Sequence, residues 1–237
     1  MTRIEVITAT NASEFEQYQE SLAVSYIEAF AGPPWFEVSR CDNNVCDMRF
    51  NPADIGTACP FCGVAMGPAY TQEELAIEWA QKLTEEDATF EVAVNEENEA
   101  VRATIAHPLT RAELFTRKYG KEVPAMEEWI DATLPPNLVW IDDTFANRRK
   151  SPTGNLRDRG VTLARIAFNY PTISVIGTRT KAPEIVASTL RDVGPYTDLY
   201  DGDPAITLTS TALRDRARLI GKVPDERTFL AIDTQQF

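Results

Sequence analysis

Four cysteines, all within one short segment, are the residues of this chain whose types and spacing are best suited to chemistry. They form two pairs, Cys41 with Cys46 and Cys59 with Cys62, and the second pair reads Cys-Pro-Phe-Cys-Gly. A tight turn lets two thiolates of a Cys-x-x-Cys pair bind one ion, and Gly63 frees the backbone directly after the second ligand. Two such pairs separated by about a dozen residues predict a zinc site with four thiolate ligands.

Because four cysteines fill the coordination sphere of zinc and leave no position for water or substrate, we expect a structural role for this metal. The alternative is a pair of disulfides. The N-terminal residues lead directly into a strand-like run and lack the charged and apolar regions of a secretory leader. We therefore expect a cytoplasmic location, where clustered thiols favour a metal. No apolar stretch reaches the length that a membrane span requires.

The composition describes an acidic chain that can form a sizeable core. Of its 237 residues, 43% are hydrophobic, and the formal net charge is -13. An acidic surface argues against a nucleic-acid partner, because phosphate backbones attract basic surfaces. The charge is compatible with a cationic substrate or partner, and equally with solubility alone.

The charge is unevenly distributed along the chain. Residues 73–99 contain ten acidic side chains and only one basic residue, Lys82. In contrast, residues 148–165 contain six basic side chains, and only Asp158 opposes them. A basic segment in an acidic chain indicates a local anion.

The elements that must position these residues begin with a strand at 3–8, whose apolar and polar residues alternate. A helix with a capping box at Ser13 and Glu16 follows and is predicted to end near Gly32. The cysteine segment, 36–70, reads as a loop-built module. After it we expect a helix capped by Thr71 and Glu74, and then a hairpin.

The hairpin strands are predicted at 89–94 and 100–106, and the acidic turn 95–99 joins them. Beyond the hairpin, a helix capped by Thr110 and Glu113 is predicted to end near Gly120. A strand at 137–145 and a helix running to Ala167 follow. The last predicted elements are a strand at 172–176, a helix at 182–193 capped by Gly194, and a short strand at 206–209. This order predicts an α+β fold with a mixed sheet flanked by helices.

The chain resembles the GNAT-type N-acetyltransferases in three segments. These are 26–35 at the end of the first helix, 139–168 with its strand, basic loop and helix, and 172–179 with the helix after it. The resemblance implies a GNAT-like domain formed by residues 1–35 and 71–237. Residues 36–70 would then be a small inserted module that resembles a zinc ribbon.

In the GNAT family, the loop after the fourth strand binds the pyrophosphate of acetyl-CoA at a helix N-terminus, where free amides and the helix dipole favour an anion. The nearest match here is 157–162, in which Thr162 replaces the small residue of the family pattern. In a second register the helix begins near Gly154, and both registers stay open. The coenzyme-binding residues implied over both registers are Phe145, Arg148, Arg149, Arg157, Arg159, Gly160 and Thr162.

The resemblance also implies catalytic residues. A base must take a proton from the ammonium form of the acceptor, and Asp142 or Asp143 on the 137–145 strand could serve. Alternation places these neighbours on opposite faces, so at most one of them points into the cleft. The tyrosine that is the usual acid of the family corresponds to Leu190 here, and Tyr196 could replace it. His107, the only histidine, receives no role.

Together these features predict an acetyl-CoA-dependent N-acetyltransferase that acts on an amine acceptor and carries a structural zinc. The alternative is a non-catalytic binding or adaptor protein, in which a degenerate GNAT-like core carries a zinc module that makes the contacts. The basic segment favours the enzyme, and Leu190 and Thr162 favour the adaptor. The identity of the acceptor is not predicted.

Overall fold

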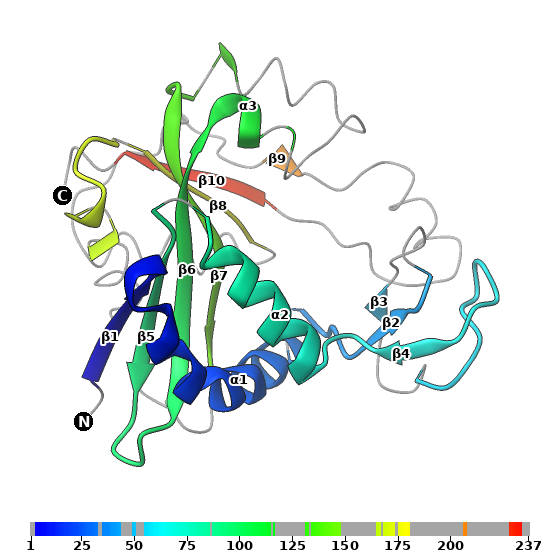
Figure 1. Ribbon diagram of the computed structural model, residues 1–237. Coiled ribbons are helices and arrows are strands. Elements are labelled where there is room, and N and C mark those ends of the chain that lie inside the picture. The colour runs from blue at the N-terminus through cyan, green and yellow to red at the C-terminus, as the bar shows by residue number, and fades with distance from the viewer. Residues whose placement is uncertain are drawn as a thin grey trace. The chain divides into compact units, whose positions relative to one another are not determined.

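The computed structural model of the chain (Figure 1) provides a fold of helices and strands in which two β-sheets occur. It describes residues 3–32, 35–43, 49–50, 55–85, 87–114, 116, 131–132, 134–147, 165–166, 168–173, 175–180, 206–207 and 228–233. The strands are β1 (Arg3–Thr8), β2 (Ser39–Cys41), β3 (Arg49–Phe50), β4 (Met66–Pro68), β5 (Thr89–Val94), β6 (Ala100–Thr110), β7 (Asn137–Ala146), β8 (Val175–Thr180), β9 (Ile206–Thr207) and β10 (Thr228–Asp233). The helices are η1 (Ala9–Tyr18, a 3-10 helix), α1 (Gln19–Ala31), α2 (Gln72–Lys82) and α3 (Arg111–Leu114).

The larger sheet has seven strands in the order β1-β5-β6-β7-β8-β10-β9, and the smaller sheet has the order β3-β2-β4. In the larger sheet β1 pairs with β5 antiparallel, β7 pairs with β8 parallel, and β10 pairs antiparallel with both β8 and β9. The predicted α+β class with a mixed sheet is therefore confirmed.

The chain divides into two compact units. The first contains residues 1–85, 89–103 and 144–153, and the second contains residues 86–88, 104–143 and 154–237. Strands β6 and β7 contribute residues to both units.

The helical segment of the first unit starts earlier than the sequence predicts. Thr8 has an extended backbone (φ -131°, ψ 177°) and forms the capping box with Asn11, so the predicted box at Ser13 and Glu16 is wrong. The Asn11 Oδ1 atom accepts a hydrogen bond from the Thr8 N–H at 2.7 Å. Residues from Ala9 onward are already wound as a 3-10 helix, so Ser13 lies inside a helix rather than before one.

Helices α1 and α2 pack on the β5 and β6 strands through an aromatic core (Figure 1). Phe15 is almost fully buried and contacts Phe90 on β5 and Trp79 on α2, with ring centroids 5.1 and 5.9 Å apart. The Ser25 hydroxyl donates to the Ala100 carbonyl at 3.1 Å, which ties α1 to β6. The predicted capping box of Thr71 and Glu74 is present at the start of α2.

The core of the second unit lies where β6, β7 and β8 meet a short helical segment. Its buried residues are Ala106, Val139, Ile141, Ile166, Tyr170 and Ile176. The Tyr170 hydroxyl donates to the Asp87 carbonyl, which joins this segment to the start of the hairpin. The predicted capping pair of Thr110 and Glu113 is also present, because the Glu113 carboxylate accepts from the Thr110 N–H at 2.9 Å.

The C-terminal half differs from the sequence-based expectation in two places. The strand predicted at 172–176 begins at Val175, because Tyr170 to Ile173 form a turn in which the Ile173 N–H donates to the Tyr170 carbonyl at 3.0 Å. Strand β10 was not predicted, and it pairs along its whole length with β8. The predicted helix at 182–193 lies outside the described residues.

Helices of the described part of the chain are too short or too polar to cross a lipid bilayer.

Candidate functional site

The smaller sheet positions the first cysteine of the predicted metal site. Ser39 pairs with both Phe50 and Pro68, and Cys41 at the end of β2 pairs with Met66 at the start of β4. These strands have only two or three residues each, so few backbone hydrogen bonds hold them. An isolated sheet of this size is not stable in water without a further constraint.

A tight turn presents the second cysteine pair. The Gly63 N–H donates to the Cys59 carbonyl at 2.9 Å, and the Cys59 N–H donates to the Val64 carbonyl at 2.7 Å. Gly63 adopts a left-handed backbone with φ 73°, which residues with a Cβ adopt only at a cost. The turn therefore requires a glycine at the position directly after Cys62.

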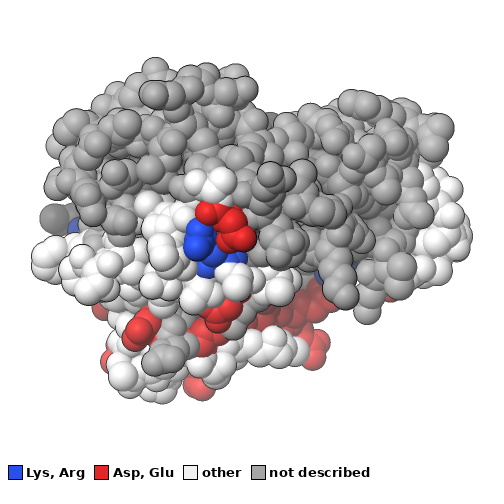
Figure 2. Space-filling model, turned by 90° about the horizontal axis from the view of Figure 1, so that it is seen from above, with Lys and Arg blue, Asp and Glu red and all other residues white. Residues whose placement is uncertain are grey.

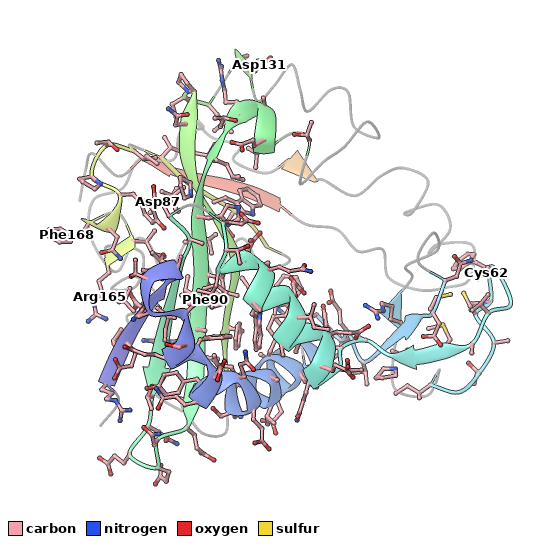
Figure 3. All side chains as sticks on the ribbon, in the orientation of Figure 1. Cys62, Asp87, Phe90, Asp131, Arg165 and Phe168 are labelled. Carbon is pink, nitrogen blue, oxygen red and sulfur yellow. The ribbon has the colours of Figure 1, made fainter. Side chains whose placement is uncertain are left out.

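Three of the four cysteines converge. The sulfur atoms of Cys41, Cys59 and Cys62 all lie within 4.8 Å of one another, and Figure 3 shows other sulfur atoms beside Cys62. The Cys41 and Cys62 sulfurs are 3.4 Å apart, well beyond the roughly 2.05 Å of a disulfide bond. Cys41 and Cys59 are buried and Cys62 is exposed. Cys46, the fourth predicted ligand, lies outside the described residues.

The two ends of the cysteine segment lie side by side. The Ala69 N–H donates to the Val38 carbonyl at 2.9 Å, and Arg40 forms an ion pair of 2.6 Å with Glu74 at the start of α2. Partial burial acts to raise the pKa of Glu74, but hydrogen bonds from Arg40 and Thr71 outweigh it, so this pKa is lowered. The ionised carboxylate thus links the small sheet to the helix.

The two candidate bases on β7 are both partly exposed as whole residues, but the side chain of Asp142 is only 8% exposed and has defined partners. Its Oδ1 atom accepts a hydrogen bond of 3.0 Å from Trp140 Nε1, and its Oδ2 atom lies 3.3 Å from Nδ1 of His107 on β6. His107 is only 2% exposed. Sequence reasoning gave His107 no role. The signal that could have found it is the neighbouring position of β6 and β7 in the sheet.

The pairing of β7 with β8 ends directly before Asp142 among the residues that the structure describes. Its register joins Val139–Ile141 to Ile176–Thr178, while β7 continues to Ala146. The Thr178 hydroxyl donates to the Ile141 carbonyl at 3.2 Å. Both aspartates therefore lie on the part of β7 that follows this parallel ladder.

Other predicted site residues fall elsewhere. Phe145 is 2% exposed, and its ring contacts Tyr26 and Trp79 with centroids 4.9 and 6.1 Å apart, so it forms part of the aromatic core. The predicted residues that lie outside the described ranges are Arg148, Arg149, Arg157, Arg159, Gly160, Thr162 and Tyr196.

Acidic side chains are visible at several places on the described part of the face shown in Figure 2, beside a small basic group. This agrees with the net charge of -13 and with the expectation of an acidic surface.

No protein-family profile matches the chain, and no curated protein matches it in sequence. Solved structures do resemble it. A putative arylalkylamine N-acetyltransferase 7 from the yellow fever mosquito is 12% identical, with a TM-score of 0.53, 98% of this chain covered and 87% of the other. Arylalkylamine N-acetyltransferase 2 from Aedes aegypti is 10% identical, with a TM-score of 0.49 and 98% of both chains covered.

An aminoglycoside acetyltransferase in complex with coenzyme A and kanamycin is 12% identical, with a TM-score of 0.48, 99% of this chain covered and 96% of the other. The likeness to the putative arylalkylamine N-acetyltransferase 7, with its TM-score of 0.53, shows the fold of this chain. At 12% identity the likeness defines the architecture alone. The chain has the GNAT fold.

Proposed function

We propose that this protein is an acetyl-CoA-dependent N-acetyltransferase that acts on an amine acceptor. The observation that carries the proposal is the parallel pairing of β7 with β8, which ends at Ile141 within a sheet of GNAT architecture. In sheets with parallel strands, ligands bind beyond the carboxyl ends of those strands. The candidate bases Asp142 and Asp143 come directly after this point.

The chemistry asks two things of the chain. A group must take a proton from the ammonium form of the acceptor, since only the free amine is a nucleophile. A backbone N–H of β7 must donate to the carbonyl oxygen on which negative charge develops. Acetyl-CoA, when bound, supplies the activated carbonyl. The net charge of -13 would attract a cationic acceptor.

We propose that the basic segment binds the phosphates of the coenzyme. Its residues would surround a helix N-terminus, where unpaired N–H groups and the helix dipole favour anions. Both registers remain part of the proposal, one built on Arg157, Arg159, Gly160 and Thr162 and the other on Arg148 and Arg149. Tyr196 is proposed as the acid that protonates the leaving thiolate.

We propose that Cys41, Cys46, Cys59 and Cys62 bind a structural zinc. Two thiolates on one tetrahedral zinc, each bonded at about 2.3 Å, lie about 3.8 Å apart. The 3.4 Å between the Cys41 and Cys62 sulfurs is close to that spacing, and the donor set contains only thiols, which zinc favours. The described residues therefore fit this metal.

We also propose that residues 36–70 are an inserted module held by the metal. The hydrogen bond between Val38 and Ala69 supports this, because it brings the start and the end of the segment together. A segment that returns to its starting point can be inserted without separating the elements around it.

A Gly63→Ala variant should bind zinc more weakly than the wild type. A Cβ at this φ of 73° costs about 1 kcal/mol, and no atom within 4 Å would clash with it, so the effect is confined to the backbone. That cost corresponds to a loss of about fivefold in zinc affinity, measured by competition with a chelator. Gly56→Ala is the matched control, because Gly56 has a similar positive φ of 79° and open surroundings but does not adjoin a cysteine. Equal losses in the two variants would contradict a specific role for the turn.

Thermal unfolding with and without acetyl-CoA tests the coenzyme site. At a ligand concentration about a hundredfold above its dissociation constant, a binder gains about 2.7 kcal/mol of stability. Coenzyme A without the acetyl group should also stabilise the chain, whereas an unrelated anion such as sulfate should not at equal concentration. A melting temperature that does not move at millimolar acetyl-CoA would overturn the proposed function and favour the adaptor.

Transfer itself should be followed by mass spectrometry of the acceptor, because the four cysteines of the chain would react with the thiol reagents that detect free coenzyme A. A panel of small amines with labelled acetyl-CoA would identify the acceptor class. Binding of acetyl-CoA without transfer to any amine of the panel would support a degenerate core.

A further inference from the structure

We propose that His107 and Asp142 act as one base, in which His107 accepts the proton of the amine and Asp142 fixes the imidazole. The inference rests on the proposed acetyl transfer and assigns a role to a residue that the sequence left without one. His107 on β6 and Asp142 on β7 lie on neighbouring strands of the sheet, with 3.3 Å between Nδ1 and Oδ2. Their side chains are 3% and 8% exposed.

Asp142 is held by a hydrogen bond at one oxygen and faces the imidazole of His107 with the other. Trp140 Nε1 donates to its Oδ1 at 3.0 Å, and His107 Nδ1 faces its Oδ2. N–H donors favour the ionised form of a carboxylate. An anion beside Nδ1 stabilises the tautomer whose proton is on Nδ1, and the lone pair then resides on Nε2. The basic atom of the pair is therefore Nε2 of His107.

The proton transfer balances with these groups alone. The N–H bond of the substrate ammonium breaks and an N–H bond forms at Nε2, and because Nε2 is buried in this structure, a water relays the proton. The amine lone pair then forms the new C–N bond to the acetyl carbon while the C–S bond of the thioester breaks, and the second proton of the acylated nitrogen goes to the departing thiolate. The positive charge of the imidazolium is offset by Asp142, and the proton on Nε2 leaves to solvent.

A histidine suits this task better than an aspartate alone, because its charge changes near neutral pH, where a general base is most effective. The 3.3 Å separation is longer than an ideal hydrogen bond, and such contacts commonly tighten when substrate binds. The position also favours the pair, since Asp142 directly follows Ile141, where the pairing with β8 ends among the described residues. Burial of an acid and a base in contact costs stability, and such pairs concentrate at functional sites.

Nitrogen NMR provides the first test, and it does not depend on activity. His107 is the only histidine of the chain, so its two ring nitrogens are assigned without ambiguity. We expect the proton on Nδ1 in the wild type, and a shift of the population toward the other tautomer in Asp142→Asn. Asp143→Asn removes the same charge at the adjacent position and should leave the tautomer unchanged. A wild-type proton on Nε2, or a tautomer that does not respond to Asp142→Asn, would overturn the inference.

Kinetics provide the second test. His107→Gln should lower kcat about 10²- to 10⁴-fold, the usual contribution of a general base, while the KM for acetyl-CoA stays unchanged. Trp140→Phe removes only the donor to Oδ1 of Asp142, so it should lower kcat less than His107→Gln does. This variant also tests the pair if His107→Gln does not fold. Ile77→Ala, at an exposed site on α2, is the control that should match the wild type.

The outcomes separate this inference from the function on which it rests. An active wild type with an unaffected His107→Gln variant would overturn the role of His107 and leave acetyl transfer standing. A wild type that neither binds acetyl-CoA nor transfers acetyl would overturn both the function and this catalytic role.

Discussion

A Cys59→Ser variant should lose the zinc that we propose for the cysteine site and, with it, the ordered structure of the small β3-β2-β4 sheet. Structural zinc contributes about 10–16 kcal/mol of apparent binding free energy in zinc-finger peptides, and that free energy is available only when the ligands are brought together by folding. The strands of this sheet have two or three residues each. Such a sheet has little stability of its own, so the metal would supply most of it.

Three measurements would show this loss. Elemental analysis should fall from about one zinc per chain to none, since a serine hydroxyl is a poor substitute for a thiolate. Limited proteolysis should cut within 36–70 in the variant and not in the wild type. The larger sheet should unfold at a lower temperature as well, because Arg40 on β2 is paired with Glu74 on α2.

Asp42→Asn is the matched control for this prediction. Asp42 adjoins Cys41 but lies outside the group of converging sulfurs, with its carboxylate against Gly67 of β4. The variant should therefore keep its zinc. Zinc retained at full stoichiometry in Cys59→Ser would contradict the site, and Cys46→Ser would decide whether Cys46 is the fourth ligand.

Trp79→Ala should be the most damaging single substitution in the core of the first unit. Trp79 is 1% exposed and contacts the rings of Phe15, Tyr26 and Phe145 at centroid distances of 5.9, 5.8 and 6.1 Å. Its removal leaves a large cavity among aromatic rings, and such substitutions typically cost about 3–5 kcal/mol. Denaturant unfolding should show a lower midpoint with an unchanged slope.

Ile77→Ala on the same helix controls for the loss of an apolar side chain. Ile77 is 54% exposed, so its truncation should change the free energy of unfolding by about 0.5 kcal/mol or less. A loss in Trp79→Ala as small as that of Ile77→Ala would show that the aromatic core is not the main source of stability in this unit.

Local patterns in the sequence were sufficient to predict the helices and strands whose ends are determined by residues close to those ends. The capping box of Thr71 and Glu74, the strand at 3–8 and the hairpin about 95–99 all form as predicted. In the hairpin the Asn95 side chain accepts from the Glu99 N–H at 2.8 Å, and Asn98 takes a left-handed φ of 64°, which asparagine tolerates. These interactions span four residues or fewer.

Predictions were wrong or incomplete where two nearby capping patterns compete, or where a strand forms only by pairing with another strand that is distant in the sequence. Ser13 and Glu16 match the capping pattern, but the box that forms at Thr8 and Asn11 is only five residues earlier. Strand β10 exists because β8 offers it a complete antiparallel partner, and β8 lies about fifty residues away in the chain.

The cysteine spacing by itself predicted a shared metal site and a turn that needs Gly63, since both follow from bonds and dihedral angles within a few residues. The composition and order of elements likewise determined the mixed α+β class. Only the tertiary structure placed His107 beside Asp142, because the two are brought together by the order of strands in the sheet rather than by any spacing along the chain. Contacts of that kind depend on which strands become neighbours, and the long-range packing that decides this leaves no local pattern in the residues concerned.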